Sequence, residues 1–290
     1  KLVFQAPLPP MGYRQVRLRD GEMPQGRLKV TAEGNILENE YLRIQFSADG
    51  CAGIYDKLNG RELFAGGETG CRAVIIDDPS DTWSHDVQSF NKEAGAFGNA
   101  RLIITENGPL RATIRVISAY GASMLTCDWT LYAGSGNPEV NVTLDWHEHL
   151  KMLKFSFPLA VESPVATYET PYGHIIRETN GNEDPGQRWI DVTGIQKGER
   201  YGLTVINDAK YGYSVAGSDL RISVARSAVY AHHNPRILDV KAEHLWMDQG
   251  IQTFRMLLVP HRDSWIESNI ARIAEEFSAP PVAVYQGIHG

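Results

Sequence analysis

The sequence predicts an all-β protein, and three observations lead to this prediction. Apolar and polar residues alternate with a period of two along many short segments, as in strands that bury one face. Turns of the Asp-Gly, Asn-Gly or Gly-rich kind separate these segments, at 49–50, 59–60, 107–109 and 134–138. One segment near the end of the chain shows helical spacing instead. Because Asp-Gly and Asn-Gly suit tight hairpins, we expect neighbouring strands to pair antiparallel.

The predicted strands follow one another along most of the chain. In residues 41–46, Leu42, Ile44 and Phe46 share one face, and residues 123–132 and 140–146 repeat the alternation. Further strands are predicted at 110–119, 154–157, 201–207, 220–225 and 252–259.

Ser264 is the predicted N-cap of the single helix. Glu267 lies three residues later, which is the spacing of a capping box, in which each of the two side chains accepts a hydrogen bond from the other residue's backbone. Four apolar residues then recur at helical spacing, and two prolines end the segment. The four are Ile266, Ile270, Ile273 and Phe277, and the prolines are Pro280 and Pro281. We expect this helix to pack over a sheet.

Composition bounds the class of protein. The 290 residues are 42% apolar and 22% charged, with a net charge of −7. An acidic chain does not favour nucleic acid, and no apolar run approaches the ~18 residues of a membrane span. The first residues do not resemble a secretory signal, and three cysteines without CxxC spacing indicate neither a disulfide framework nor a zinc–thiolate site. We therefore expect a soluble, cytoplasmic protein that binds neither nucleic acid nor membrane.

The densest polar segment is residues 77–86. Its candidate binding residues are Asp77, Asp81, Trp83, His85 and Asp86. Carboxylates, an imidazole and an indole so close together could hold a cation, or could bind a sugar by stacking and hydrogen bonding. The alternative is a loop whose Asp and Ser side chains bond their own backbone in Asx turns.

A second polar segment, residues 177–189, reads as a long loop between strands. Arg177, Arg188 and Trp189 are its candidate ligand-binding residues. An indole can cover the apolar face of a pyranose while a guanidinium binds its hydroxyls. The alternative is a solvated hairpin loop with Trp189 in the core.

Other patterns carry less chemistry. His147 and His149 could chelate zinc if the strand 140–146 continued, but Lys151 stands where an HExxH motif needs its second histidine. The His232-His233 pair reads as a surface turn. No Gly-x-Ser-x-Gly motif, phosphate loop or cysteine in a catalytic setting is present in the sequence.

Several stretches together resemble the C-terminal β region of α-mannosidases of glycoside hydrolase family 38. The stretches occur in order from about residue 30 to the end of the chain. They are 35–43, 49–50, 54–57, 60–63, 77–85, Asp145-Trp146-His147-Glu148, 153–154, 172–173, Arg177, 189–192, 206–208, 210–213, 220–223, 225–227, Asp248-Gln249-Gly250 and 260–261.

The resemblance implies a large antiparallel β-supersandwich of the galactose-mutarotase-like kind, which follows a catalytic barrel in the same polypeptide. In this family two aspartates carry out a retaining hydrolysis of α-mannosides, and zinc held by His and Asp ligands binds the sugar hydroxyls. Those residues belong to the N-terminal catalytic domain, so no catalytic or metal residue is assigned to this chain. We expect zinc in the full-length enzyme, none in this chain, and a chain that is inactive alone.

These expectations divide the chain into two parts. Residues 1–30 would end a preceding small β module or linker, and residues 31–290 would form the supersandwich. The segments 77–86 and 177–189 would line the rim of the active site, where an α-mannoside binds, and the protein could form a homo-oligomer.

Two other functions remain open at this stage. A stand-alone carbohydrate-binding or aldose-epimerase-like domain is one, with His85 or His174 as the acid and Glu148 as the base. A purely structural scaffold is the other.

Overall fold

Within the residues that the computed structural model describes, which are 3–17, 30–239 and 241–284, twenty strands form three sheets. All of the strand pairs in these sheets are antiparallel. The predicted all-β fold with one short helix is therefore confirmed.

The first sheet is a five-stranded meander close to the start of the described chain. In order across the sheet its strands are β1 (Thr31–Glu33), β2 (Ile36–Glu38), β3 (Leu42–Phe46), β4 (Ala52–Asp56) and β5 (Arg61–Glu62). In β3 the residues Leu42, Ile44 and Phe46 are buried, as the alternation predicts.

The second sheet has nine strands and is the largest of the three. Its order is β14 (Gly173–Arg177), β13 (Glu162–Thr170), β16 (Trp189–Gln196), β17 (Glu199–Asn207), β20 (Gly250–Arg262), β11 (Glu139–Trp146), β10 (Ser123–Tyr132), β9 (Arg111–Tyr120) and β8 (Gly98–Asn107).

The third sheet has six strands, in the order β15 (Asn180–Pro185), β18 (Gly212–Ala216), β19 (Asp219–Arg226), β12 (Lys151–Pro158), β6 (Arg72–Asp77) and β7 (Glu93–Ala96). All eight predicted strand segments fall on observed strands, apart from Tyr41 and Leu110, which lie just before β3 and β9.

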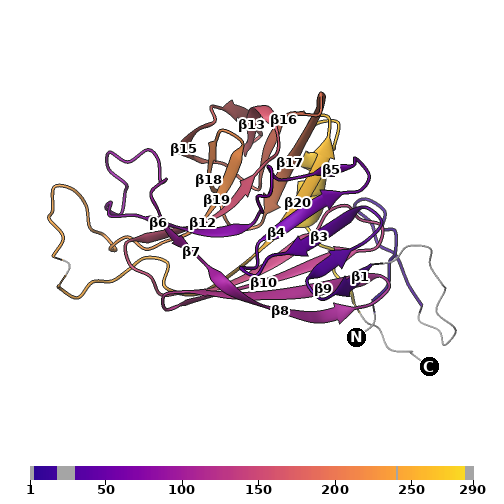
Figure 1. Cartoon of the computed structure of the whole chain (residues 1–290), viewed down its shortest axis with the longest axis horizontal. Coiled ribbons are helices and arrows are strands. Elements are labelled where there is room, and N and C mark those ends of the chain that lie inside the picture. Colours follow the sequence, from indigo (N-terminus) through magenta and orange to yellow (C-terminus); the bar gives the residue numbers. More distant parts are fainter. Residues whose placement is uncertain (1–2, 18–29, 240, 285–290) are drawn as a thin grey trace.

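One large core lies between the sheets. In Figure 1 the five-stranded sheet covers the β8–β10 part of the nine-stranded sheet, and the six-stranded sheet lies beside its β13–β17 part. Phe46 meets Trp129 edge-on at a centroid distance of 5.5 Å, and Phe155 packs near Phe254 at 6.2 Å. Burial of these aromatic rings supplies much of the hydrophobic stabilisation.

The predicted N-cap of the helix was wrong by five residues, because the observed N-cap is Asn269. Ser264 and Glu267 do form the capping box, with Ser264 N donating to Glu267 Oε2 at 3.0 Å, but α1 spans Ile270–Ser278. Asn269 has a φ of 55°, in the left-handed region, so a helix begun at Ser264 cannot run through it. Ile266 consequently lies outside the helix and is 64% exposed, whereas Ile270 is buried.

The prediction of a loop at 177–189 was also wrong, because this segment contains strand β15. The strand is an edge strand that pairs with β18, with an irregularity in register between Asn180 and Glu183. Asn, Gly and Pro are depleted in strands, which explains why composition indicated a loop. Pairing with a neighbouring strand overrides that preference here.

No helix in the described parts of the chain is long and apolar enough to cross a membrane. The predicted boundary near residue 30 falls beside residues 18–29, which lie outside the described residues, so it stays a prediction.

Candidate functional site

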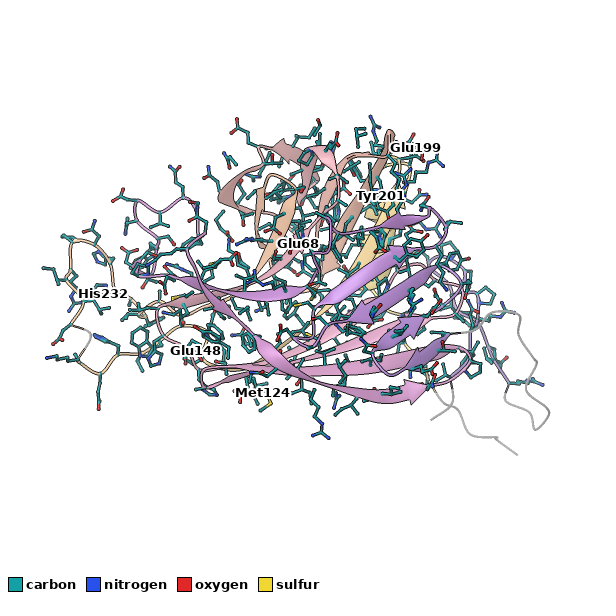
Figure 2. The ribbon with its side chains drawn as sticks, viewed as in Figure 1. Glu68, Met124, Glu148, Glu199, Tyr201 and His232 are labelled. Carbon is teal, nitrogen blue, oxygen red and sulfur yellow. The ribbon has the colours of Figure 1, made fainter. Side chains whose placement is uncertain are left out.

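Three loops gather at one end of the molecule, which we call the loop end. They are residues 78–92 between β6 and β7, 147–150 between β11 and β12, and the described residues 227–239 and 241–249 between β19 and β20. Figure 1 shows two of them extending to the left, and Figure 2 places His232 and Glu148 there. Six of the nine histidines lie in these loops: His85, His147, His149, His232, His233 and His244.

Arg226, the last residue of β19, holds the first loop in place. Its Nε donates to Asp78 Oδ2 at 2.6 Å, and its other nitrogens donate to the carbonyls of Asp81 and Thr82 and to the Ser80 hydroxyl. The guanidinium also lies over the Phe90 ring, 5.2 Å from its centroid. A planar guanidinium with five donors suits this role in a way that a lysine ammonium does not.

Asp81 ties the first loop to the third. It accepts hydrogen bonds from the backbone N–H groups of Trp83, His85 and Asn234 and from the His85 ring. Desolvation raises the pKa of Asp81, but the hydrogen bonds from His85 and Asn234 outweigh it and hold that pKa below its usual range. The Asx-turn alternative therefore describes Asp81 well, although it also acts between loops.

Trp83 is presented to solvent by this framework, with 59% of its surface exposed. Its ring lies 6.4 Å from that of His85 and 5.5 Å from that of His233, which belongs to the third loop. The three rings form an exposed aromatic platform, which we call the Trp83 platform. Such a surface can stack against the apolar face of a sugar.

Asp77 and Asp86 lie at the two ends of this segment and do not join the platform. Asp77 pairs with Lys151 at 2.9 Å and with Lys92 at 3.1 Å, and the hydrogen bond from Lys151, followed by that from Lys92, lowers the pKa of its carboxyl. Asp86 is exposed and has a φ of 60°.

The second predicted set lies elsewhere. Trp189 is only 2% exposed, packed under α1, so the alternative that places it in the core is correct. Arg188 binds Glu169 on β13 and Glu275 on α1, and the bond to Glu169 raises the pKa of its guanidinium. Arg177 pairs with Asp184 at 2.7 Å. Among the described residues, no hydrogen bond or ion pair joins these three to segment 77–86.

The acid and base candidates for an epimerase each interact with different neighbours and not with one another. Glu148 accepts from Ala122 N at 3.0 Å and from the Ser123 hydroxyl at 2.8 Å. His174 packs against Trp265 at a ring distance of 4.8 Å, and His85 binds Asp81. The described structure shows no hydrogen bond between Glu148 and either histidine.

His147 and His149 do not converge on one face, because β11 ends at Trp146. His147 pairs with Asp145 at 2.8 Å, and His149 stacks on Trp246 at 4.1 Å. The described part of the chain contains no group of three or more His, Cys, Asp or Glu side chains placed to hold a metal ion. The described residues therefore do not fit a zinc site.

A buried polar cluster on the outer face of the nine-stranded sheet escaped the sequence analysis. Asp191 Oδ1 accepts from His261 Nε2 and from the Thr204 hydroxyl, both at 2.7 Å, and Oδ2 accepts from the Thr193 hydroxyl at 2.8 Å. In sequence, Asp191 and Thr193 look like the solvent face of an alternating strand. Only the fold shows that Asp191, at 1% exposure, is covered.

Beside this cluster lies a cavity of about 360 Å³, which we call the outer-sheet pocket. Its floor is formed by β13 and β16, one wall by β14, and the other by the turn that precedes α1. Its lining includes Val165, Thr167, Ile176, Asp191, Arg200 and Trp265.

Comparison with known proteins identifies the family. Residues 37–234 match the family described as "Glycosyl hydrolases family 38 C-terminal domain". Alpha-mannosidase 2C1 of Homo sapiens is 30% identical over 296 residues, covering 96% of this chain and 26% of the relative. The Mus musculus protein of the same name is 29% identical, covering 86% of this chain and 24% of the relative. The chain thus spans about a quarter of the length of these curated relatives.

Solved structures agree with this assignment at the level of the fold. A glycosyl hydrolase family 38 protein from Enterococcus faecalis superposes with a TM-score of 0.72 at 16% identity, covering 90% of this chain and 34% of that one. An α-mannosidase from Enterococcus faecalis V583 gives 0.72 at 15% identity, covering 90% and 33%. The chain belongs to the glycosyl hydrolase family 38 C-terminal domain family.

Proposed function

We propose that this chain is the C-terminal β domain of an α-mannosidase, a glycosidase that hydrolyses α-mannosides. The observation that carries the proposal is the match of residues 37–234 to the family 38 C-terminal domain. Since the chain covers only about a quarter of its curated relatives, we assign the hydrolysis to the longer protein and none to this chain alone.

The proposed chemistry of the longer protein is a retaining, zinc-dependent hydrolysis. The described residues offer no cluster for a metal, so we derive no step of that chemistry from them. These residues can bind the substrate, orient it and cover it from solvent. An exposed aromatic platform on anchored loops suits substrate positioning next to a catalytic domain.

We assign that positioning role to the Trp83 platform. Trp83 is exposed, His85 is oriented by Asp81, and Arg226 fixes the loop that carries them both. The other predicted rim residues contribute less, because Trp189 is buried and Arg188 is held by two carboxylates.

Expression of the longer protein tests the hydrolysis. It should hydrolyse an aryl α-mannoside with retention of the anomeric configuration, as followed by NMR, and should lose activity when zinc is removed. The 290-residue chain alone should be inactive. An inactive longer protein, or an active isolated chain, would contradict the proposal.

A pair of variants in the longer protein tests the platform. Trp83→Ala should lower kcat/KM for the mannoside roughly tenfold, the loss expected when one good stacking contact to the sugar is removed. Tyr172→Ala, an exposed aromatic on the β13–β14 turn, serves as the matched control and should leave kcat/KM unchanged. Equal kinetics for Trp83→Ala and the unaltered enzyme would remove the platform from the proposal.

The cytoplasm is the proposed location. All three cysteines are free and buried, and burial raises the pKa of Cys127 to about 12. Protonated, buried thiols are consistent with a chain that does not use disulfides. Cell fractionation of the longer protein against compartment markers tests this location.

A further inference from the structure

The outer-sheet pocket lies far from the loop end and contains none of the predicted rim residues. Figure 2 labels Glu199 and Tyr201, the neighbours of Arg200 on β17, at the opposite end of the molecule from His232. The pocket is therefore a separate site from the Trp83 platform, and a ligand bound there would add a function to the hydrolysis proposed above.

The floor of the pocket offers an unused hydroxyl. Thr167 on β13 is 3% exposed, and its side chain makes no hydrogen bond with any other residue that the structure describes. Although Thr167 is largely covered, its Oγ1 is not one of the fully buried side-chain atoms that lack a hydrogen-bond partner, so the hydroxyl is open to the pocket. Because Thr167 lines the cavity, a ligand or a water molecule there can supply the missing partner.

The carboxylate beside Thr167 is already fixed in place. Thr167 and Asp191 are direct partners in the β13–β16 ladder, and three donors hold the two Asp191 oxygens. The ring nitrogen of His261 that faces Asp191 is Nε2, which also lies 3.2 Å from the Thr204 hydroxyl. This arrangement gives the floor a rigid carboxylate whose two oxygens are engaged by three neighbouring side chains.

One wall of the pocket is an indole. Trp265 is half-buried and packs on Trp189 at a ring distance of 5.1 Å and on His174 at 4.8 Å. Two further rings therefore restrict its orientation. The exposed side chains of Val165 and Ile176 form the apolar wall on the β13–β14 side.

A guanidinium lies at the mouth. Arg200 is exposed, and within the described residues its side chain forms no ion pair or hydrogen bond. Its neighbour Glu199 pairs instead with Arg61 and Arg262. The five donors of Arg200 remain available to a ligand.

From these features we infer that the outer-sheet pocket is a non-catalytic binding site for a single pyranose ring. An indole and aliphatic walls match the C–H surface of a sugar, while Arg200, Thr167 and Asp191 match its hydroxyls. The volume of about 360 Å³ is near the lower end of the range for small-ligand sites, roughly 300–1,000 Å³. Fixed strands on its floor and a packed indole limit the ordering cost of binding.

A titration of the 290-residue chain with methyl α-D-mannopyranoside and, separately, methyl β-D-galactopyranoside tests the site. In ¹H–¹⁵N spectra, at least one glycoside should cause saturable shifts in the amides of Thr167 and Thr193 and in the Trp265 indole N–H. Because the readout is binding to this chain, it succeeds or fails independently of hydrolysis by the longer protein.

Conservative variants make the test specific. Thr167→Val and Arg200→Ala should each raise the dissociation constant roughly tenfold, with folded spectra retained. The control Arg101→Ala, at an exposed arginine on β8, should leave it unchanged. Shifts confined to the loop end, or no saturable shift with either glycoside far above the millimolar range, would overturn the inference.

Discussion

The loop end and the outer-sheet pocket bring polar and aromatic side chains together by different means. At the loop end, Arg226 holds the first loop in place and Asp81 binds it to the third loop through side-chain hydrogen bonds. In the pocket, the ladder that pairs Thr167 with Asp191, and Asp191 with Thr204, sets the positions. The geometry of the loop end therefore depends on a few side-chain hydrogen bonds. In the pocket, the positions of the floor residues change only if the strand pairing changes.

The largest expected effect is on the free energy of unfolding, and it should differ between Trp189 and Trp83. Trp189→Ala empties a buried site under α1 and should lower the free energy of unfolding by about 3–5 kcal/mol. Trp83→Ala removes an exposed ring and should change it by about 0.5 kcal/mol or less. Urea denaturation followed by circular dichroism measures both values. Equal losses of stability would mean that the two regions do not differ as described.

The second largest loss of stability is expected when Arg226 is replaced. Arg226→Ala leaves the fully buried Asp78 carboxylate without its ion-pair partner, which typically costs 3–5 kcal/mol when both groups are buried. Because Arg226 itself is partly exposed and Ser80 still binds Asp78, we expect about 2–3 kcal/mol here.

Hydrogen exchange can show where the Arg226 effect is located. The Thr82 and His232 amides, which bond within the loop end, should lose protection, while amides of the β17–β20 ladder should keep theirs relative to global unfolding. Arg226→Lys should recover only part of the loss, since an ammonium cannot make four divergent contacts. Uniform loss of protection over the whole chain would contradict a local role for Arg226.

Much of the fold could be predicted because local pattern and tertiary structure agree. The segment 123–132 alternates cleanly and forms β10 with the predicted boundaries. The segment 180–185 carries Asn, Gly and Pro, so its strand exists only because β18 provides a partner. The helix boundary failed for a similar reason, since one left-handed residue, Asn269, separates the capping box from α1.

The candidate site was less predictable, since it depends on contacts between distant segments. Trp83 and His85 could be selected from one dense segment, but His233 reaches the platform from about 150 residues away. The spacing and composition around Arg226 and Asp191 gave no sign of their contacts, because each residue sits within a strand. Their roles follow from burial, which composition and spacing do not reveal.

A smaller effect is expected within the sheet itself. Asp191→Asn keeps the size of the side chain but turns an NH₂ group toward donors from Thr193, Thr204 or His261, and should cost about 1–2 kcal/mol. Unlike Arg226→Ala, it should leave the protection of the Thr82 amide unchanged relative to global unfolding. Asp86→Asn, at an exposed position, is the matched control and should be neutral in urea denaturation. A neutral Asp191→Asn would show that its three donors find other partners.

The smallest expected effect is a loss of stability at low pH that involves Asp81. Hydrogen bonds from His85 and Asn234 hold the pKa of Asp81 below its ordinary 3.8, against the opposing effect of desolvation. The folded state therefore binds a proton at Asp81 less readily than the unfolded state does. The stabilisation is present above pH 3.8 and is lost as the pH falls from there toward the lowered pKa.

Because His85 is half exposed, we expect this contribution to be about 0.5 kcal/mol or less. It should be visible as a fall in the protection factor of the Asn234 amide below pH 3.8, since that amide donates to Asp81. The Val205 amide, buried in the β16–β17–β20 sheet, should change less over the same range. In Asp81→Asn the Asn234 amide should be poorly protected at every pH. An acid response at Asn234 that persists in this variant would place the sensitivity of the loop end in a different carboxylate.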